Sequence, residues 1–478
     1  MADLFTTIET PSGKYEQPLG LFINNEFVKA KSGRTFETIN PTNEKPIVAV
    51  QEADENDVED AVKAARAAFE GEWRKVTPSE RGRLLTKLAD LFERDIDILA
   101  AIESLDNGKA FTMAKGDVGA AAGCLRYYGG WADKIHGQTI DTNPESLTYT
   151  RHEPIGVCGQ IIPWNFPLLM WSWKIGPAVA AGNVVVLKTA EQTPLSGLYA
   201  AKLIKEAGFP AGVVNIISGF GRVAGAAISS HMDIDKIAFT GSTLVGRMIL
   251  QAAAKSNLKK VTLELGGKSP NIVFDDADID NAISWSNFGG IHDKFVARFK
   301  ERAAANKLGN PFTADTFQGP QVSQLQFDRI MEYIDHGKKE GATVATGGER
   351  HGTEGYFIQP TVFTDVHSDM KIAKEEIFGP VVTVQKFKDE EEAIKIGNST
   401  SYGLAAAVHT KNVNTAIRVS NALRAGTVWI NNYNMINYQA PFGGFKESGI
   451  GRELGSYALE NYTQVKTVHY RLGDALFA

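Results

Sequence analysis

The chain has 478 residues, 43% hydrophobic and 22% charged, a composition typical of a globular protein with two or three domains. Its net charge of -6 gives no basic footprint for nucleic acid, and no apolar run approaches the roughly 20 residues that span a membrane. The N-terminus carries no signal or transit pattern, so a cytoplasmic location is expected. Two cysteines, Cys124 and Cys158, predict neither a disulfide framework nor a cysteine-based zinc cluster.

The first third of the chain predicts short strands followed by helices. Residues 20–50 read as strands and turns, and apolar residues recur at helical spacing over 58–69 and again over 114–131. Between these helices, residues 77–80 (Thr-Pro-Ser-Glu) form a capping box with proline at the first helical position. This motif predicts the start of a long amphipathic helix.

From residue 146 onward, strands and helices alternate. A helix capped by Thr193-Pro194 is expected to end at Gly208. The other expected elements are strands at 146–162, 184–188, 213–218 and 236–240, and helices at 222–229 and 243–255. This rhythm predicts a doubly wound, mainly parallel sheet, and therefore an α/β fold.

A second series of strands predicts a second α/β domain, with the boundary near Gly266-Gly267; its strands are expected at 271–274, around Phe363, and at 381–384, 404–408 and 427–430. Residues 463–470 alternate again and could pair with residues 146–152 as a small β element suited to oligomer contacts. The expected division is a first Rossmann-like domain over 1–132 and 155–266, a second over 267–457, and the β element over 133–154 and 458–478.

Glu264 ends a strand-like run, and two glycines, Gly266 and Gly267, follow after Leu265. An ionisable side chain at a strand end, beside a tight turn, is where an α/β enzyme places a general base. The alternative is a surface glutamate before a turn, and this stretch alone favours neither interpretation.

Three further stretches carry candidate ligand groups. Residues 219–224 fit the Gly-x-Gly-x-x-Ala pattern, but the acidic residue expected about twenty positions later is absent, so the usual dinucleotide geometry is not expected. Gly241 and Ser242 form a strand-to-helix turn that could bind a pyrophosphate or could be a simple helix cap. Lys188 and Glu191 follow a strand end and could hold ribose hydroxyls, which favours NAD over NADP, or form a solvated ion pair.

Residues 162–167 (Ile-Pro-Trp-Asn-Phe-Pro) place two prolines around one asparagine, Asn165. A preorganised neutral amide suits an oxyanion, and the alternative is a rigid turn capped by the asparagine side chain.

Together with residues 163–167, five other motifs occur in the order and approximate spacing of the aldehyde dehydrogenase superfamily, at 188–194, 239–242, 263–268, 375–380 and 441–446. The chain resembles this family over nearly its whole length, and it is most similar to the NAD-dependent class that oxidises simple aldehydes to acids. The resemblance implies NAD as cofactor, a small aldehyde as substrate and a homodimer or homotetramer.

The resemblance also implies roles for individual residues. Glu264 resembles the general base, Lys174 a lysine of its proton relay, and Asn165 the oxyanion-binding amide. Trp173, Phe442 and residues 431–440 resemble the lining of an aldehyde tunnel. The implied cofactor contacts are Ile161, Trp164, Lys188, Glu191, Gly221 near the adenine, Gly241, Ser242, Leu265, Glu376 at the nicotinamide ribose, and Phe378 beside the nicotinamide.

The chain departs from the family where the nucleophilic cysteine is expected, thirty-odd residues after Glu264. Roughly twenty residues are missing between Ile291 and Asp293, namely the catalytic loop and the strand after it, which a βαβ alternation also requires. Cys124 and Cys158 lie in apolar stretches typical of structural cysteines. His292, at the junction, has no attacking Ser or Cys near it in the sequence.

Three explanations of the gap stay open. The chain is a truncated product of altered splicing or of a wrong exon boundary, or a non-catalytic form that keeps the NAD site, or its sequence omits residues that the natural molecule contains. The first two predict almost no dehydrogenase turnover, and the loss of an inner strand predicts low stability. The rival to an enzyme is a non-catalytic NAD-binding or structural protein.

Overall fold

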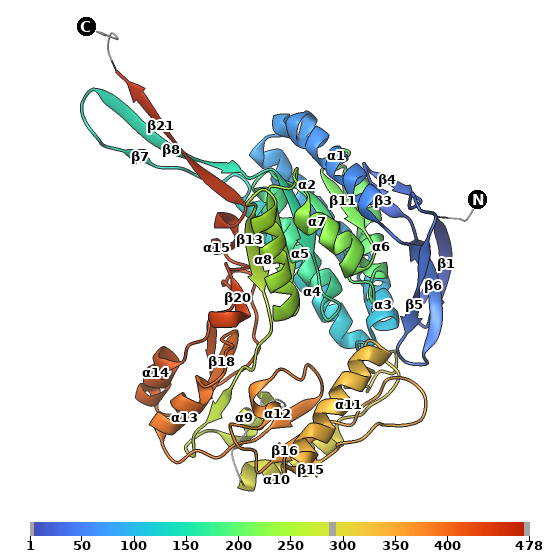
Figure 1. The fold of residues 1–478 in the computed structure, drawn as a ribbon, viewed down its shortest axis with the longest axis vertical. Helices are drawn as coiled ribbons and strands as arrows, with labels where there is room; N and C mark the ends of the chain where they lie inside the picture. The colour runs from blue at the N-terminus through green and yellow to red at the C-terminus, as the bar shows by residue number, and fades with distance from the viewer. Residues whose placement is uncertain (1–3, 286–292, 473–478) are drawn as a thin grey trace.

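The structure, a computed structural model, describes residues 4–285 and 293–472. Its largest unit is an eight-stranded sheet in the order β20-β13-β12-β9-β10-β11-β3-β4 (Figure 1). The five inner strands are parallel, and β3 and β20 join them antiparallel. The strands are β3 (Leu21–Ile23), β4 (Glu26–Val28), β9 (Val157–Ile161), β10 (Val184–Lys188), β11 (Val214–Ile217), β12 (Lys236–Thr240), β13 (Lys260–Glu264) and β20 (Gly449–Ile450).

Helices cover both faces of this sheet, as the predicted alternation requires. The inner strands β9, β10 and β12 are buried along their whole length, whereas β13 is only partly buried. Burial on both faces is why β10 (Val-Val-Val-Leu-Lys) has an almost continuous apolar sequence. The helices are α1 (Glu55–Glu70), η1 (Glu72–Lys75), α2 (Pro78–Arg94), α3 (Ile96–Asn107), α4 (Phe111–Trp131), α5 (Pro167–Ala180), α6 (Leu195–Ala207), the π-helical turn η2 (Gly221–Gly225), α7 (Ala226–Ser230) and α8 (Thr243–Lys255).

Local signals in the sequence set several helix ends. The Thr77 hydroxyl accepts from the Glu80 N–H and the Glu80 carboxylate accepts from the Thr77 N–H, which confirms the predicted capping box of α2. Gly208 ends α6 with a positive φ of 93°. The expected cap at Thr193 is wrong, because Pro194 is the N-cap of α6 and no side chain bonds the first turn.

The part of the chain after residue 266 contains two three-stranded sheets, β14-β18-β19 and β15-β16-β17, where one sheet was expected. The strand predicted to be missing would have belonged to the one expected sheet. Its loss is a physical reason why two separate sheets are found. The elements are β14 (Asn271–Val273), α9 (Ile279–Trp285), α10 (Asp293–Ala305), α11 (Gln324–Lys339), β15 (Thr343–Thr346), β16 (Thr361–Thr364), α12 (Lys371–Lys374), β17 (Val381–Thr383), α13 (Glu390–Gly397), β18 (Ala405–His409), α14 (Val413–Ala422), β19 (Thr427–Ile430), η3 (Lys446–Ser448) and α15 (Tyr457–Glu460).

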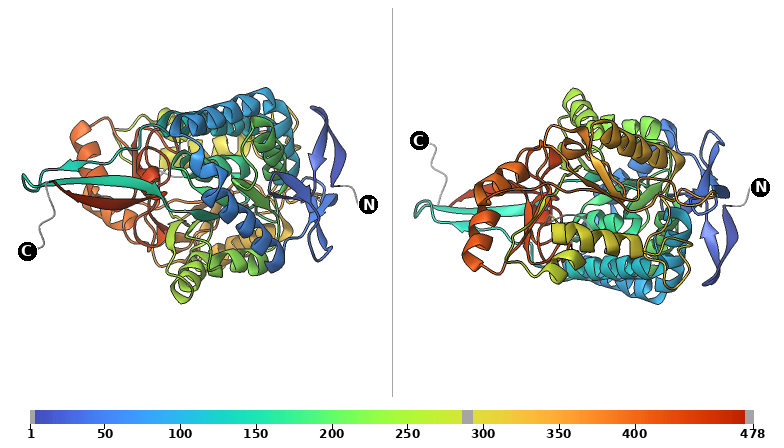
Figure 2. Two further views of the ribbon diagram at one scale, coloured as in Figure 1. Left: turned by 90° about the horizontal axis from the view of Figure 1, so that it is seen from above. Right: turned by 90° about the horizontal axis from the view of Figure 1, so that it is seen from below.

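A third three-stranded sheet, in the order β21-β8-β7, projects from the body at the end opposite the N-terminal strands (Figure 2). Here β21 (Thr463–Arg471) pairs antiparallel with β8 (Ser146–Pro154), which confirms the predicted pairing, and β7 (Thr139–Ile140) completes the sheet. Two hairpins lie near the N-terminus: β1 (Phe5–Thr10) with β2 (Gly13–Pro18), and β5 (Thr35–Asn40) with β6 (Lys45–Gln51).

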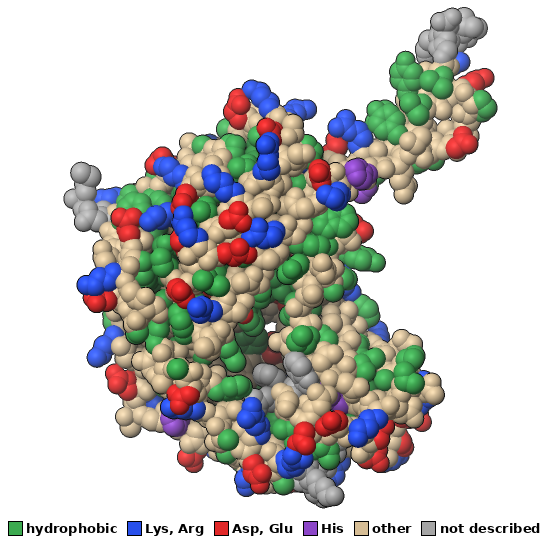
Figure 3. Space-filling model, turned by 180° about the vertical axis from the view of Figure 1, so that it is seen from behind, with side chains coloured by type: hydrophobic (Ala, Val, Ile, Leu, Met, Phe, Trp, Pro, Cys, Tyr) green, Lys and Arg blue, Asp and Glu red, His purple; other side chains and the backbone are tan. Residues whose placement is uncertain are grey.

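Seen from behind, the surface is hollowed between the part that holds the eight-stranded sheet and the part that follows it (Figure 3). Hydrophobic side chains are visible around this hollow. Among the described residues, no helix has both the length and the apolar character that a bilayer crossing requires.

Candidate active site

Three predicted site residues lie on one edge of the eight-stranded sheet, together with Thr240. Ile161, Lys188 and Glu264 are the last residues of β9, β10 and β13, and Thr240 is the last residue of β12. The chain runs from β9 outward through β10 and β11, then returns to the other side of β9 with β12. The strand order therefore reverses at β9, and open α/β sheets bind ligands at such a switch point, beyond the carboxyl ends of the strands.

Glu264 lies half-buried at this edge, between the ends of β12 and β20. Removal of its carboxylate from water raises its pKa to about 7, and the neighbouring Glu453 carboxylate adds to the rise. Lys174 and a hydrogen bond from the Thr240 hydroxyl oppose it. A carboxyl group that titrates near neutral pH can take up and release a proton, as a general base must.

Lys174 reaches the same place from α5, with its side chain fully buried. Its Nζ donates to the Thr240 Oγ1 at 2.7 Å and to the Glu453 Oε1 at 2.6 Å. Thr240 is also the ladder partner of Glu264 between β12 and β13, so Lys174 and Glu264 lie on either side of this hydroxyl. Sequence reasoning missed Glu453, because it lies in a loop nearly 190 residues from Glu264 and no local motif marks it.

Asn165 lies between the end of β9 and the start of α5, on the wall of a cavity of about 580 Å³. Two contacts from α3 hold this loop: the Asn107 amide donates to the Trp164 carbonyl at 2.6 Å, and the Glu103 carboxylate accepts from the Leu168 N–H at 2.8 Å. The Asn165 Oδ1 is buried and has no partner among the described residues. The loop is therefore anchored from outside, while the Asn165 side-chain oxygen is left as an unpaired acceptor.

Lys188 and Glu191 form an ion pair just past β10. The Lys188 side chain is only 2% exposed, and its Nζ lies 3.2 Å from the Glu191 Oε2 and 2.7 Å from the Thr189 carbonyl oxygen. Burial lowers the pKa of Lys188, and the Glu191 carboxylate opposes that shift. Because the pair is held at the switch point rather than out in solvent, the interpretation as a solvated ion pair is disfavoured.

Two glycine-containing turns, at Gly221 and at Gly241-Ser242, lie at the starts of helical segments. Gly221 opens the π-helical turn η2, and a Cβ there would meet nothing within 4 Å. Ser242 is the N-cap of α8 and accepts from the Val245 N–H, whereas the Gly241 N–H already donates to the Glu264 carbonyl. The N–H groups of the first turn of α8 thus remain as the donors that an anion could use. Leu265, buried, follows Glu264 directly.

Glu376 and Phe378 approach the site from the second part of the chain. The Glu376 Oε1 accepts from the Gly267 N–H at 3.0 Å, and a Cβ on Gly266 would lie 2.4 Å from the Glu376 Oε2. Burial raises the pKa of Glu376. Phe378 has a positive φ of 56°, and its ring lies edge-on to the Trp164 ring at 5.2 Å. The close approach explains why glycine follows the strand that ends at Glu264.

Aromatic side chains predicted to line a tunnel also meet. Trp173 of α5 is buried, and its ring lies 5.8 Å from the ring of Phe442. The structure thus brings together most of the predicted residues at the sheet edge or on the 580 Å³ cavity, whose lining includes Trp164, Asn165, Glu376 and Phe378.

Both cysteines are described, and both are fully buried. Cys124 lies in α4 and Cys158 in β9, and burial raises the pKa of each thiol to about 12. A buried thiol with so high a pKa is a poor nucleophile. The predicted gap between Ile291 and Asp293 falls at residues 286–292, which lie outside the described part of the chain together with His292.

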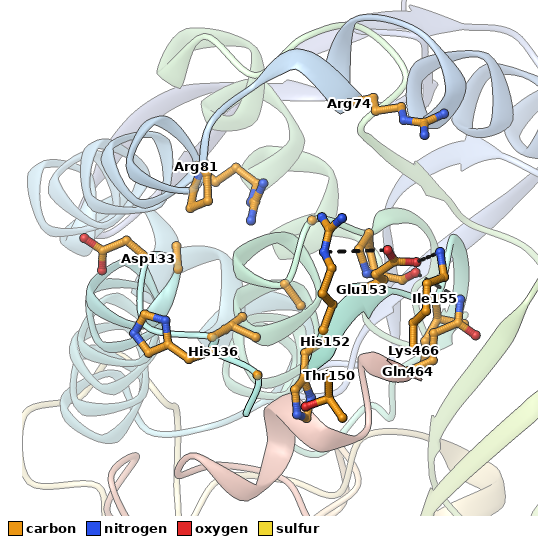
Figure 4. A pocket seen from close by; sticks show the side chains of 18 of the residues that line it. Arg74, Arg81, Asp133, His136, Thr150, His152, Glu153, Ile155, Gln464 and Lys466 are labelled. Carbon is orange, nitrogen blue, oxygen red and sulfur yellow. Dashed lines mark hydrogen bonds and ion pairs between the residues drawn. The ribbon is translucent and has the colours of Figure 1, made fainter. Parts of the chain in front are cut away.

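A second, larger cavity of about 1230 Å³ lies where β8 leaves the body (Figure 4). Its walls carry Arg81, His136 and His152, and the ion pairs of Glu153 with Arg151 and Lys466. It contains none of the predicted site residues, so it is distinct from the site at the sheet edge.

Comparison with known proteins agrees with this geometry. The family model described as "Aldehyde dehydrogenase family" matches residues 27–468. The chain belongs to the aldehyde dehydrogenase family. An aldehyde dehydrogenase of Emericella nidulans is 84% identical over 497 alignment positions that cover all of both chains. An aldehyde dehydrogenase-like protein of Schizosaccharomyces pombe is 58% identical, over 98% of this chain and 97% of its own length.

Solved structures of the family share the fold. An aldehyde dehydrogenase of Bacillus cereus in complex with NAD+ superposes with a TM-score of 0.94 at 54% identity, over 95% of this chain and 97% of that one. A betaine aldehyde dehydrogenase of Staphylococcus aureus, also with NAD+, gives a TM-score of 0.94 at 40% identity, over 96% of each chain. The predicted α/β fold and family are therefore confirmed.

Proposed function

We propose that the chain binds NAD at the carboxyl edge of its eight-stranded sheet and retains most of the machinery of an NAD-dependent aldehyde oxidation. The observation that carries this proposal is the Lys188–Glu191 pair at the switch point, beside Glu264 with its pKa of about 7. The NAD+ complexes of the Bacillus and Staphylococcus enzymes support the choice of cofactor.

The residues present fit a dinucleotide. Lys188 and Glu191 offer one donor and one acceptor to the hydroxyls of the adenosine ribose, and the Glu191 carboxylate repels a 2′-phosphate, which favours NAD over NADP. Gly221 and Ile161 would hold the adenine, and Gly241, Ser242 and the start of α8 would hold the pyrophosphate. The remaining contacts are Glu376 for the second ribose, and Trp164, Leu265 and Phe378 for the nicotinamide end.

At the reacting end, each side chain has a physical task. NAD, when bound, accepts a hydride. The Asn165 amide offers a neutral donor to an aldehyde oxygen that gains negative charge. Glu264 accepts a proton from water, and Lys174, linked through Thr240, orients that carboxylate and stabilises its charge.

The family's reaction also requires a cysteine thiolate that attacks the aldehyde, and we propose that this chain lacks it. The alignment with the Emericella relative has 497 positions and this chain has 478 residues, so at least 19 positions hold no residue of this chain. Cys124 and Cys158 are buried with raised pKa values, and neither replaces the missing thiol. The expected turnover of the chain as written is therefore close to zero.

A second candidate function is a non-catalytic NAD-binding oligomer. A cofactor site that keeps its ion pair and its helix N-terminus, without a reactive thiol, favours this role. Exposed apolar side chains on the projecting sheet, Leu147, Val465 and Tyr470, support a homodimer or homotetramer. A cytoplasmic location is part of the same proposal.

Calorimetric titration of the purified chain with NAD and with NADP tests the cofactor assignment. The expected result is saturable NAD binding that is tighter than NADP binding, with the Emericella enzyme as a positive control. An absence of NAD binding by a folded chain would contradict the proposal, and equal affinities would contradict the role given to Glu191.

A further inference from the structure

Lys268 differs from the buried lysines of this chain because its amine is not bonded. Four lysine side chains are buried in the described part of the chain, and each Nζ donates two hydrogen bonds; they are Lys174, Lys188, Lys236 and Lys259. Lys268, in the loop after β13, is half-buried. No hydrogen bond from its Nζ is found among residues 4–285 and 293–472, so its amine is available to a ligand.

The Lys268 side chain lies on the wall of the cavity of about 580 Å³, together with Asn165 and Glu376. The Asn165 Oδ1 is buried and has no hydrogen-bond partner among the described residues. Trp164 and Phe378 give the same wall an apolar surface. The cavity therefore offers a ligand one unbonded amine, one carboxyl group, one unpaired acceptor and apolar contact.

The surroundings of Lys268 favour the neutral form of its amine. Burial lowers the pKa of Lys268 from 10.5 to about 8, and the Glu376 carboxylate opposes that shift. Near pH 8, about half of the Lys268 side chains are therefore neutral, against less than about 1% of lysines with a pKa of 10.5. Since only the neutral amine has a free lone pair, Lys268 is a stronger nucleophile than an ordinary lysine. Burial also raises the pKa of Glu376, which favours the carboxyl form that can donate a proton.

We propose that the Lys268 amine captures small apolar aldehydes in this cavity as an iminium, in a reaction that needs neither NAD nor a thiol. The choice of an aldehyde as the ligand rests on the function proposed above. The apolar part of the aldehyde packs against the aromatic wall, and its carbonyl carbon meets the amine. Because the reaction does not use the absent cysteine, the chain as written retains it.

The capture is a condensation in which one water molecule leaves. The neutral Nζ forms a bond to the aldehyde carbon, and one proton moves from the nitrogen to the carbonyl oxygen to give a carbinolamine. Glu376, in its carboxyl form, donates a second proton to the new hydroxyl, the C–O bond breaks and water leaves. The products are an iminium cation and the Glu376 carboxylate, whose opposite charges attract each other. Addition of water reverses these steps, so the aldehyde is held reversibly.

Reductive trapping with the purified chain tests this proposal. The chain is mixed with propanal and sodium cyanoborohydride at about pH 8, without NAD, and the reductant transfers a hydride to the iminium carbon to give a stable secondary amine. Peptide mass spectrometry reports the rate of modification at each lysine. We expect Lys268 to react at least tenfold faster than Lys87, an exposed lysine of α2. In urea, the two lysines are expected to react at similar rates.

The pH dependence distinguishes the proposed amine from a lysine that is merely accessible. The measured quantity is the rate at Lys268 in the folded chain divided by its rate in the urea-unfolded chain at the same pH. This ratio is expected to fall at least tenfold between about pH 7.5 and 9.5. The reason is that the folded amine is already largely neutral near pH 8, whereas the unfolded amine becomes neutral only near 10.5.

A pair of variants locates the reaction. Lys268→Arg keeps the positive charge but has no nucleophilic amine, and it is expected to lose the fast phase of adduct formation in the intact mass. Lys87→Arg is the matched control and is expected to keep that phase. Melting curves show whether each variant folds. If Lys268→Arg does not fold, the ratio of the rates at Lys268 and Lys87 in the parent chain still decides the question.

Three results would overturn the proposal. They are equal rates at Lys268 and Lys87 in the folded chain, a fast phase that persists in folded Lys268→Arg, and a ratio of folded to unfolded rates that does not change with pH. Because the trapping mixture contains no NAD, its failure is distinguishable from a failure of the cofactor proposal, which the calorimetric titration tests separately.

Discussion

Replacement of the buried Lys188 by alanine tests the proposed cofactor site at its best-defined point. The Lys188 Nζ has three N–H donors, of which one bonds the Thr189 carbonyl oxygen at 2.7 Å and one pairs with the Glu191 carboxylate at 3.2 Å. The third remains for a ribose hydroxyl. Since the side chain is only 2% exposed, water does not compete strongly for it.

The geometry sets the expected magnitude. A hydrogen bond that involves a charged group contributes about 1.5–3 kcal/mol. Loss of this contact corresponds to a rise of roughly 10- to 150-fold in the Kd of NAD. Glu191 is half-buried and keeps contact with water, so removal of Lys188 is not expected to unfold the chain.

Isothermal titration calorimetry with NAD measures the effect. Lys205→Ala is the matched control: Lys205 lies in the next helix, α6, and its exposed pair with Glu26 is far from the sheet edge. Its expected Kd is that of the parent. In a second arm, Glu191→Gln removes the charge that repels a 2′-phosphate and is expected to narrow the preference for NAD over NADP about fivefold or more.

Two results would refute this reasoning. One is a Kd for Lys188→Ala within about twofold of the parent, which would mean that the ammonium makes no contact with the cofactor. The other is an unchanged ratio of NAD to NADP affinities in Glu191→Gln, which would remove the charge argument for cofactor choice.

Four further predictions concern the base, the glycine turn, the thiols and the proposed loss of a strand. Burial raises the pKa of Glu264 from 4.5 to about 7. Between pH 4.5 and pH 7, the folded chain therefore keeps a proton on this carboxyl that the unfolded chain loses. The free energy of unfolding falls as pH rises across that window. Glu264→Gln is therefore expected to gain up to about 3 kcal/mol in urea unfolding near pH 8 and nothing near pH 4, and an equal gain at both would contradict the raised pKa. Gly266→Ala displaces the Glu376 carboxylate and is expected to raise the Kd of NAD several-fold. The control is Gly116→Ala, whose added Cβ meets nothing within 4 Å. Equal Kd values for the two variants would refute the contact between Gly266 and Glu376. With an aromatic disulfide reagent at about pH 8, the native chain should release almost no thiol and the denatured chain two equivalents, whereas fast labelling of the native chain would reveal an accessible cysteine. The proposed loss of an inner strand predicts a melting temperature below that of the Emericella enzyme, and equal melting temperatures would contradict it.

Much of the fold was predictable because its signals are local. The capping box at Thr77, the left-handed Gly208 and the apolar run of β10 each need only a few neighbouring residues. The cap assigned to Thr193 failed because Pro194 takes the N-cap position without any side-chain bond. Such a choice between adjacent residues depends on how the loop packs, which the sequence pattern does not contain.

The candidate site shows the same limit at longer range. Six ordered motifs indicated Glu264, Asn165 and the residues proposed to bind the cofactor, but not Glu453, whose contact with Lys174 spans 279 residues of sequence. The raised pKa of Glu264 depends on burial and on that second carboxylate, so it too required the structure. The division of the second part into two sheets follows from pairing between strands far apart in the chain.

We propose that this chain keeps an NAD site but has lost the thiol for aldehyde oxidation. The most direct measurement is NADH absorbance in a mixture of simple aldehyde, saturating NAD and purified chain whose intact mass has been confirmed. We predict no aldehyde-dependent NADH above the blank, while the Emericella enzyme is expected to give a robust signal in the same assay. Robust NADH production by the chain of confirmed mass would contradict it.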